Sequence, residues 1–334
     1  EKIINDQSTL QLAVDRLRPE FNWDDIYIST GAEYTQIVKA QIPLLPPGNL
    51  IAEPQMRDVA AAVGYVAAML STLTPTAPFI ILWSDHLMTK TAVFKQVVAT
   101  GAKYISRHQD KILFIGQKPR FPNQNIGWIA TGPATDRLDD FPIHEFKTWH
   151  YRPSLQEARV FFHQHNYSWN PGYFIVTPQF LLDQYRQFMP EMYRQLVKLQ
   201  SSYGTPGHQT SLKQIYPTLE RLHFDNAILE RLEPDKAVVL SADMGWSDIG
   251  TWEALKEALQ AHPQDNITKG KVVLYQTKDS LVYNYTDKLV ATLDLEGMLI
   301  VVTPDVIMVC PQESVPQIKQ VIEELEATGN QKYT

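Results

Sequence analysis

The feature that most constrains the fold is an alternation of short apolar runs with stretches of helical periodicity in the first third of the chain. Four runs are typical of strands: "DIYIST", "NLIAEP", "APFIILWSDH" and "KILFIGQKP". Between them, "EYTQIVKAQI", "MRDVAAAVGYVAAML" and "AVFKQVVATGAKYI" space their apolar residues as a helix does. Strands and helices that alternate in this way form a parallel or mixed sheet covered on both faces, so we predict an α/β fold.

The pattern changes twice further along the chain. Residues 178–232 are predicted to be mainly helical, with the Gly/Pro/Ser-rich loop "SSYGTPGHQT" among them. After "AHPQDN", short β-rich runs follow one another without helices, and "VPQIKQVIEELEAT" predicts a closing helix. Such runs favour a compact β-roll or β-helix, so we expect two domains, at residues 1–262 and 266–334.

Composition excludes several classes of protein. The net charge of −7 argues against a nucleic-acid partner, which would need clustered Lys and Arg. No apolar run approaches the roughly 20 residues of a membrane span, and no signal-peptide pattern is present. Cys310 is the single cysteine and lies in the apolar run "VIMVC", so we expect a buried, inert thiol. A cytoplasmic enzyme or binding protein without a membrane partner is the expectation.

Two aspartates follow apolar strands, where ligands bind in open α/β sheets. Asp85 follows "FIILWS", and Asp248 follows "AVVLSADMGWS" in a turn rich in Trp and Gly. Two carboxylates brought together there repel unless a cation lies between them, and Mg²⁺ uses few protein carboxylates. We therefore predict a metal site for phosphate chemistry. The structural alternative is that each aspartate only caps a helix or forms a turn.

Other polar residues could meet a substrate. Glu53 and Arg57 flank the turn after the second strand, and an arginine can bind phosphate oxygens in a bidentate manner. Arg152 in "HYRP" could do the same, or could be a solvated cation at a strand end. Asn170 in "WNPG" offers the donor and acceptor that sugar hydroxyls need, although a turn would also explain it.

These residues lie in segments that resemble the mannose-1-phosphate guanylyltransferases (GDP-mannose pyrophosphorylases), a family of sugar nucleotidyltransferases. "GWSDIGTWEAL" closely resembles the family's "GWSDVGSWxAL", "IAEPQMRDVAAAV" its "EPxxRNTAPAI", and "ILWSDH" its "LPADH". "NIGWIATG", "YSWNPGYF" and "HFDNAILERL" are similar to "GYGYI", "WNSGMF" and "SIDYAVLEK", in the same order. The resemblance covers nearly the whole chain.

The resemblance implies a nucleotide-diphospho-sugar transferase fold, a Rossmann-like mixed sheet followed by a small left-handed β-helix domain. It implies Mg²⁺-dependent transfer of GMP from GTP to mannose 1-phosphate, which releases pyrophosphate and GDP-mannose. Asp85 and Asp248 would hold the metal, and Arg152 would keep the cation of the family's "FVEKP" segment. The nucleotide would lie near Glu53, Pro54, Arg57 and Asp58, and the sugar near Gly127, Tyr151, Asn170 and Asp225.

The chain departs from the family pattern in three places. The family's "GGxGTRLWP" phosphate loop and most of its "PKQF" are not in the sequence, which begins at Glu1. We expect no transfer without that loop and an intact enzyme if it precedes Glu1. Asp58 and Val59 replace polar residues near the base, and Tyr151 replaces a glutamate expected to bind sugar hydroxyls.

These departures leave two alternatives beside the guanylyltransferase. One is a sugar-1-phosphate nucleotidyltransferase with another base or sugar, and the other is a non-catalytic nucleotide-sugar-binding paralogue. The β-helix offers strand edges that can pair chains, so a homo-oligomer is also expected.

Overall fold

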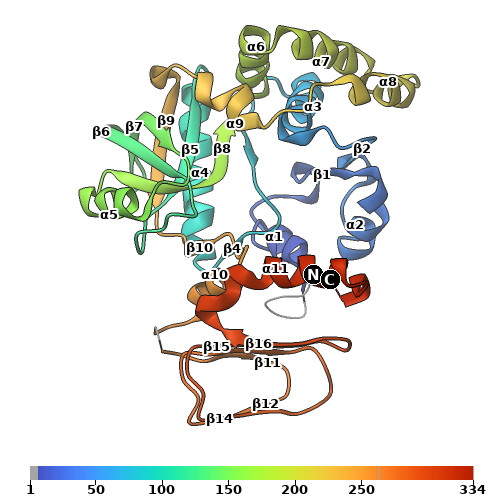
Figure 1. Ribbon diagram of the computed structural model, residues 1–334. Coiled ribbons are helices and arrows are strands. Elements are labelled where there is room, and N and C mark those ends of the chain that lie inside the picture. Colours follow the sequence, from blue (N-terminus) through green and yellow to red (C-terminus); the bar gives the residue numbers. More distant parts are fainter. Residues whose placement is uncertain (1–6, 263, 334) are drawn as a thin grey trace. The chain divides into compact units, whose positions relative to one another are not determined.

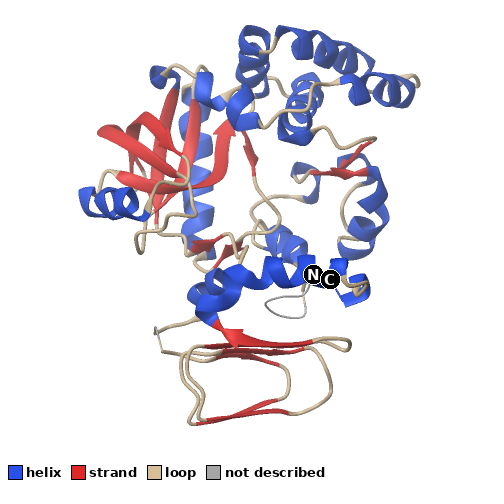
Figure 2. Cartoon of the chain, viewed as in Figure 1, coloured by secondary structure: helices blue, strands red, loops and turns tan. Residues whose placement is uncertain are grey.

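The computed structural model describes residues 7–262 and 264–333, which form two compact units (Figures 1 and 2). The first unit is Glu1–Trp246 and the second is Ser247–Thr334. Among the described residues, no helix has the length and apolar character needed to cross a membrane.

A six-stranded mixed sheet forms the centre of the first unit. Its strands are β3 (Phe79–Ile81), β5 (Ile112–Gln117), β6 (Trp128–Leu138), β7 (Phe141–His150), β8 (Tyr167–Val176) and β9 (Ala237–Ala242). They lie in the order β3-β8-β5-β9-β7-β6. β8 is antiparallel to β3 and β5, whereas β5 and β9 are parallel. β5 is buried along its whole length, as expected of a central strand.

A separate parallel pair and two helices precede this sheet. β1 (Ile28–Gly31) pairs with β2 (Leu50–Glu53), and helix α2 (Thr35–Gln41) connects them. Helix α1 (Thr9–Asp15) is capped by Ser8: the Ser8 hydroxyl accepts from the Gln11 backbone N–H, and Ser8 N donates to the Gln11 side chain in a capping box.

Helices cover the sheet and form a helical layer beyond it (Figure 1). They are α3 (Asp58–Leu73), α4 (Thr91–Arg107), α5 (Leu155–Gln164), α6 (Pro178–Phe188), α7 (Pro190–Ser202), α8 (His208–Ile215) and α9 (Phe224–Ala227). Small residues let α3 pack closely on its neighbours: a Cβ on Gly64 would lie 2.8 Å from Leu196 Cδ1. The prediction of a mainly helical 178–232 segment is confirmed.

The second unit is built on short parallel rungs. β11 (Ile267–Lys269), β13 (Leu281–Asn284) and β15 (Met298–Val302) stack in parallel, as do β12 (Val272–Tyr275) and β14 (Val290–Leu293). β16 (Ile307–Pro311) joins β15 antiparallel. Val282, Ile300 and Val302 form the small core between the rungs.

Helices α10 (Trp252–Leu259) and α11 (Ile318–Ala327) complete the second unit. The units divide after Trp246, earlier than the boundary at 262–266 drawn from the sequence. Helix α10 contacts the β-helix through an ion pair between the buried Lys256 and the partly exposed Asp279, which is consistent with its place in the second unit. Asp248 therefore belongs to the second unit.

Candidate active site

Three strands of the main sheet have their carboxyl ends on the same side. β3 and β5 are both antiparallel to β8, and β9 is parallel to β5, so all three run in the same direction. Asp85 follows β3, which is an edge strand, Gln117 is the last residue of β5, and Asp243 directly follows β9.

Asp85 lies in a turn between β3 and the short strand β4 (Leu87–Met88), and its side chain is 77% exposed. Hydrogen bonds with two aromatic side chains hold the ring of the neighbouring His86. Trp246 Nε1 donates to His86 Nδ1 over 3.0 Å, and the Tyr173 hydroxyl lies 3.0 Å from the same nitrogen. Because an indole N–H only donates, Nδ1 is an acceptor and the proton of neutral His86 lies on Nε2. Nε2 is 4.0 Å from Asp85 Oδ1.

Backbone hydrogen bonds also join the chain after Asp85 to the segment that precedes Asp248. Thr89 N donates to the Gly245 carbonyl over 3.1 Å, and Lys90 N donates to that of Met244 over 3.0 Å. The chain after Asp85 therefore runs beside residues 244–246, and Asp248 follows Trp246 by two positions. Asp248 itself belongs to the second unit, so its pairing with Asp85 stays a prediction.

Asp248 is half-buried in a tight turn of the second unit. Its Oδ1 accepts weakly from Gly250 N at 3.5 Å, and Ile249 has a positive φ of 39°. The alternative of a cap or a turn is therefore correct only for the turn, because Asp248 does not cap a helix. Thr251 caps α10 instead, through a bond of 3.2 Å from Ala254 N to its hydroxyl.

The sequence reasoning missed Gln117 and Asp243. Gln117 is fully buried, and its Oε1 accepts from Met244 N at 2.9 Å and from Trp246 N at 3.3 Å. Its Nε2 donates to Asp243 Oδ1 over 2.9 Å. Desolvation tends to raise the pKa of Asp243, but bonds from Lys90, Gln117 and Gly245 N outweigh it and lower the pKa. A polar residue at the end of the apolar run "ILFIGQ" was the available signal.

Arg120 was also missed. Its Nη1 donates to the Trp246 carbonyl over 3.1 Å, and its guanidinium lies 5.0 Å from the centre of the Trp169 ring. This arginine therefore connects the segment before Asp248 with the strand that carries Asn170.

Three residues predicted to contact a sugar lie together at the edge formed by β6, β7 and β8. Trp128 pairs with His150 on one side and with Trp169 on the other, so Gly127 lies beside Tyr151 and Asn170. Asn170 N donates to the Gly127 carbonyl over 2.8 Å. The Asn170 Oδ1 accepts from Gly172 N, which forms the turn.

Tyr151 and Arg152 are placed differently from Asn170. Tyr151 is 78% exposed, and the Arg152 guanidinium lies 5.3 Å from the centre of its ring. Arg152 has a positive φ of 43°, which turns the chain at the end of β7. Both residues therefore lie where the chain leaves the end of β7.

The residues predicted for the nucleotide form a second group at the turn from β2 to α3. Both Glu53 oxygens are engaged, by the Ser29 hydroxyl at 2.8 Å and the Tyr216 hydroxyl at 2.6 Å. Burial, followed by the neighbouring Glu53 charge, raises the pKa of Tyr216, which stays a donor. Pro54 follows Glu53 directly and begins the turn. Glu53 thus positions this turn.

Arg57 carries the clearest binding signal of the turn. Its Nε is buried without a hydrogen-bond partner, and its Nη2 makes only a 3.4 Å contact with Gln55. A buried N–H without a partner is costly, so an acceptor from a ligand would stabilise this guanidinium. Asp58 begins α3 with a positive φ of 67° and lies 3.5 Å from His223 Nδ1.

Asp225 lies in the first turn of the short helix α9. The residue is exposed, yet its surroundings desolvate the carboxyl and raise its pKa. No contact joins Asp225 to Gly127 or Asn170 among the hydrogen bonds of the described residues, so its predicted place near the sugar stays a prediction.

The two residues predicted to bind the metal lie in different units, so their joint site stays a prediction. Asp85 presents an exposed carboxylate and Asp248 a weakly bonded one. Among the described residues, no three His, Cys, Asp or Glu side chains gather as a closed metal site. Mg²⁺ is commonly bound by one or two carboxylates with waters and substrate phosphates, and carboxylates of this kind are the donors that it uses.

Comparisons with known families define the class of this chain. Residues 3–265 match the family described as Nucleotidyl transferase, and residues 270–325 match the MannoseP isomerase/GMP-like beta-helix domain. The chain therefore belongs to the nucleotidyl transferase family, and the predicted fold with a C-terminal β-helix domain is confirmed.

Two proteins named as mannose-1-phosphate guanylyltransferases are similar to this chain. Mannose-1-phosphate guanylyltransferase of Escherichia coli is 24% identical, over 99% of this chain and 71% of its own length. Mannose-1-phosphate guanylyltransferase 2 of Escherichia coli O157:H7 is 27% identical over 86% of this chain. The chain spans 60% of that second relative.

A solved structure agrees with the fold. The crystal structure of a protein described as "mannose-1-phosphate geranyltransferase", from Thermus thermophilus, superimposes with a TM-score of 0.81 and 22% identity, over 96% of this chain and 90% of that one. At this identity the likeness establishes the fold alone.

Proposed function

We propose that the protein transfers GMP from GTP to mannose 1-phosphate, with Mg²⁺, and releases GDP-mannose and pyrophosphate. Family membership and the named relatives support the reaction class. The observation that carries the proposal is the buried Arg57 Nε without a hydrogen-bond partner, at the turn predicted to bind the nucleotide.

In this reaction the protein has to bind and orient the two substrates, since the sugar phosphate is itself the nucleophile. Asp85 and Asp248 would hold the metal, which when bound offsets the charge of the phosphates. Arg57 would donate its unpartnered Nε to the nucleotide, and Arg152 would add a cation at the sugar side. Gly127 and Asn170 would receive the sugar, where the absent Cβ leaves the backbone accessible.

Asp248→Asn tests the metal assignment. We expect Mg²⁺-dependent pyrophosphate release from GTP and mannose 1-phosphate to fall by on the order of 10²-fold or more, because an amide is a poor ligand for this hard cation. Asp287→Asn is the matched control, since Asp287 lies in the same unit and its side chain is fully exposed. Wild-type turnover by the Asp248→Asn protein, with an unchanged melting temperature, would contradict the assignment.

Tyr151 motivates a second candidate, a nucleotidyltransferase for another sugar or base. An exposed tyrosine cannot accept from two vicinal hydroxyls as a carboxylate does. Turnover of a panel of nucleoside triphosphates and hexose 1-phosphates separates the candidates, and a clear preference for GTP with mannose 1-phosphate eliminates the second. Binding of nucleotide sugar without any turnover by the full-length native protein would favour the non-catalytic paralogue.

We also propose that the native protein is a homo-oligomer. An exposed apolar row on the β-helix, formed by Val273, Tyr275 and Leu293, supports this.

A further inference from the structure

We propose that Lys256 is a positioning residue for Asp248: its ion pair with Asp279 locks helix α10 onto the β-helix and thereby fixes the aspartate turn. The inference rests on the proposed role of Asp248 as a metal ligand. It concerns only the second unit.

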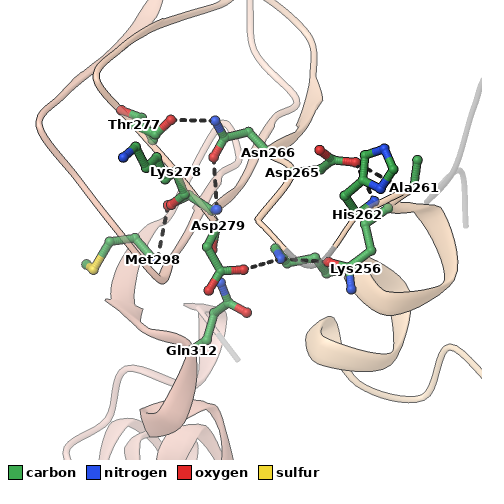
Figure 3. A network of polar contacts seen from close by, with 12 residues as sticks. Lys256, Ala261, His262, Asp265, Asn266, Thr277, Lys278, Asp279, Met298 and Gln312 are labelled. Atoms are coloured by element: carbon green, nitrogen blue, oxygen red, sulfur yellow. Dashed lines mark hydrogen bonds and ion pairs between the residues drawn. The ribbon is translucent and has the colours of Figure 1, made fainter. Parts of the chain in front are cut away.

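Lys256 is a buried cation at the junction of the helix and the rungs. Its side chain is 6% exposed, and Nζ donates to Asp279 Oδ1 over 2.5 Å (Figure 3). Nζ also donates to Gln260 Oε1 over 2.8 Å. A lysine is rarely buried unless it is paired, because removing the charge from water is costly. Asp279 supplies the opposite charge that this buried lysine needs.

Asp279 is itself held firmly by the β-helix. It has a positive φ of 49°, its N–H donates to the Gln264 carbonyl over 3.0 Å, and its own carbonyl accepts from the Gln312 side chain. The adjoining Ser280 N donates to Asn266 Oδ1 over 2.9 Å. The acceptor for Lys256 thus stands on a rigid turn.

The other end of α10 is connected to the Asp248 turn. Ser247 is buried, and its hydroxyl donates to the Ala254 carbonyl over 3.3 Å and accepts from Ile249 N over 3.2 Å. These bonds fix Ser247 and Ile249, the residues before and after Asp248. The Trp252 ring meets Tyr283 edge to face, at 5.7 Å between centroids, which adds a second contact of α10 with the rungs.

The contacts therefore form one chain from the β-helix to the aspartate: Asp279, Lys256, the body of α10, Ala254, Ser247 and the Asp248 turn. A helix that shifts along its axis would carry the turn with it. Since a displacement of about 1 Å can cost a catalytic group about 10²-fold in rate, the ion pair has a functional reason beyond stability.

The test compares Lys256→Met with Lys256→Arg in the full-length native protein. We expect Lys256→Met to raise the Mg²⁺ concentration for half-maximal pyrophosphate release on the order of tenfold, with little change in the KM for the sugar phosphate. Lys256→Arg keeps the charge and should stay close to wild type. Asp279→Asn retains a residue that tolerates positive φ and should behave as Lys256→Met does.

A second readout needs no metal and no activity. Hydrogen exchange of the backbone amides of residues 247–252 should become faster in Lys256→Met, and not in Lys256→Arg. Asp287→Asn removes the exposed partner of Lys271 in the same unit and should change neither readout.

The outcomes separate the two proposals. If Asp248→Asn turns over normally, the metal assignment fails and this inference fails with it. If Asp248→Asn is inactive while Lys256→Met only lowers the melting temperature, with unchanged Mg²⁺ dependence and unchanged exchange at 247–252, the pair is merely structural and the inference is overturned. Should Lys256→Met not fold, Asp279→Asn decides by the same two readouts.

Discussion

His208 shows how a single buried residue sets a pH dependence of stability. It is 9% exposed, with the Tyr65 hydroxyl 2.9 Å from Nε2 and the Ser202 hydroxyl 3.0 Å from Nδ1. Desolvation lowers its pKa below the ordinary 6.5. As the pH falls, His208 therefore binds a proton in the unfolded chain before it does so in the folded protein. Its contribution to the free energy of unfolding is full above pH 6.5 and is lost as the pH drops through the folded pKa.

We expect His208→Gln to flatten this acid limb of the stability curve. The measurement is the free energy of unfolding in urea between about pH 7.5 and about pH 5. His163→Gln is the control, because His163 is exposed on α5 and should leave the slope as it is. An equally steep slope in His208→Gln and wild type would show that other groups cause the loss.

Residue-level features can be predicted from the sequence where their cause is local. The Ser8 cap depends only on its own capping box, which the pattern "STLQ" indicates. The capping alternative for Asp248 failed because Thr251, three residues on, competes for the same role and wins it. Gln117 went unnoticed because its partners lie more than a hundred residues away, at Asp243, Met244 and Trp246.

At the scale of elements, Gln117 joins the ends of β5 and β9. We expect Gln117→Leu to lower the free energy of unfolding by about 2–4 kcal/mol, since the Met244 and Trp246 N–H groups would stay buried and lose their acceptor. The midpoint of urea unfolding should move at an unchanged m-value. Gln179→Leu, at an exposed position on α6, is the matched control.

A Gln117→Leu protein as stable as the control would mean that the turn after β9 re-forms its bonds elsewhere. Elements themselves were predictable because hydrophobic periodicity is a property of neighbouring residues. Their assembly was not: nothing local in "TWEALKEALQ" indicates that Lys256 will pair with Asp279 and draw α10 into the second unit. The residue types of the candidate site could be named from the sequence, whereas the unit to which Asp248 belongs needs the tertiary contacts.

At the scale of the whole molecule, an apolar row on the β-helix bears on assembly. Val273, Tyr275 and Leu293 are 52%, 60% and 66% exposed. The parallel register of β12 and β14 places Val273 beside Ala291 and Tyr275 beside Leu293. Contiguous exposed apolar side chains mark interaction surfaces more often than scattered ones do.

We expect this row to be the contact between copies of the chain. A two-fold axis repeats each residue's contact, so one charge in the row appears twice in a dimer and opposes itself. Leu293→Glu should therefore shift the mass measured by light scattering, at micromolar concentration, from a multiple of one chain to a single chain, with an unchanged melting temperature. Val160→Glu puts the same charge on an exposed apolar position of α5 and should leave the native mass intact. If wild type is already monomeric, or if Leu293→Glu keeps the wild-type mass, the row does not join the chains and its exposed side chains simply face solvent.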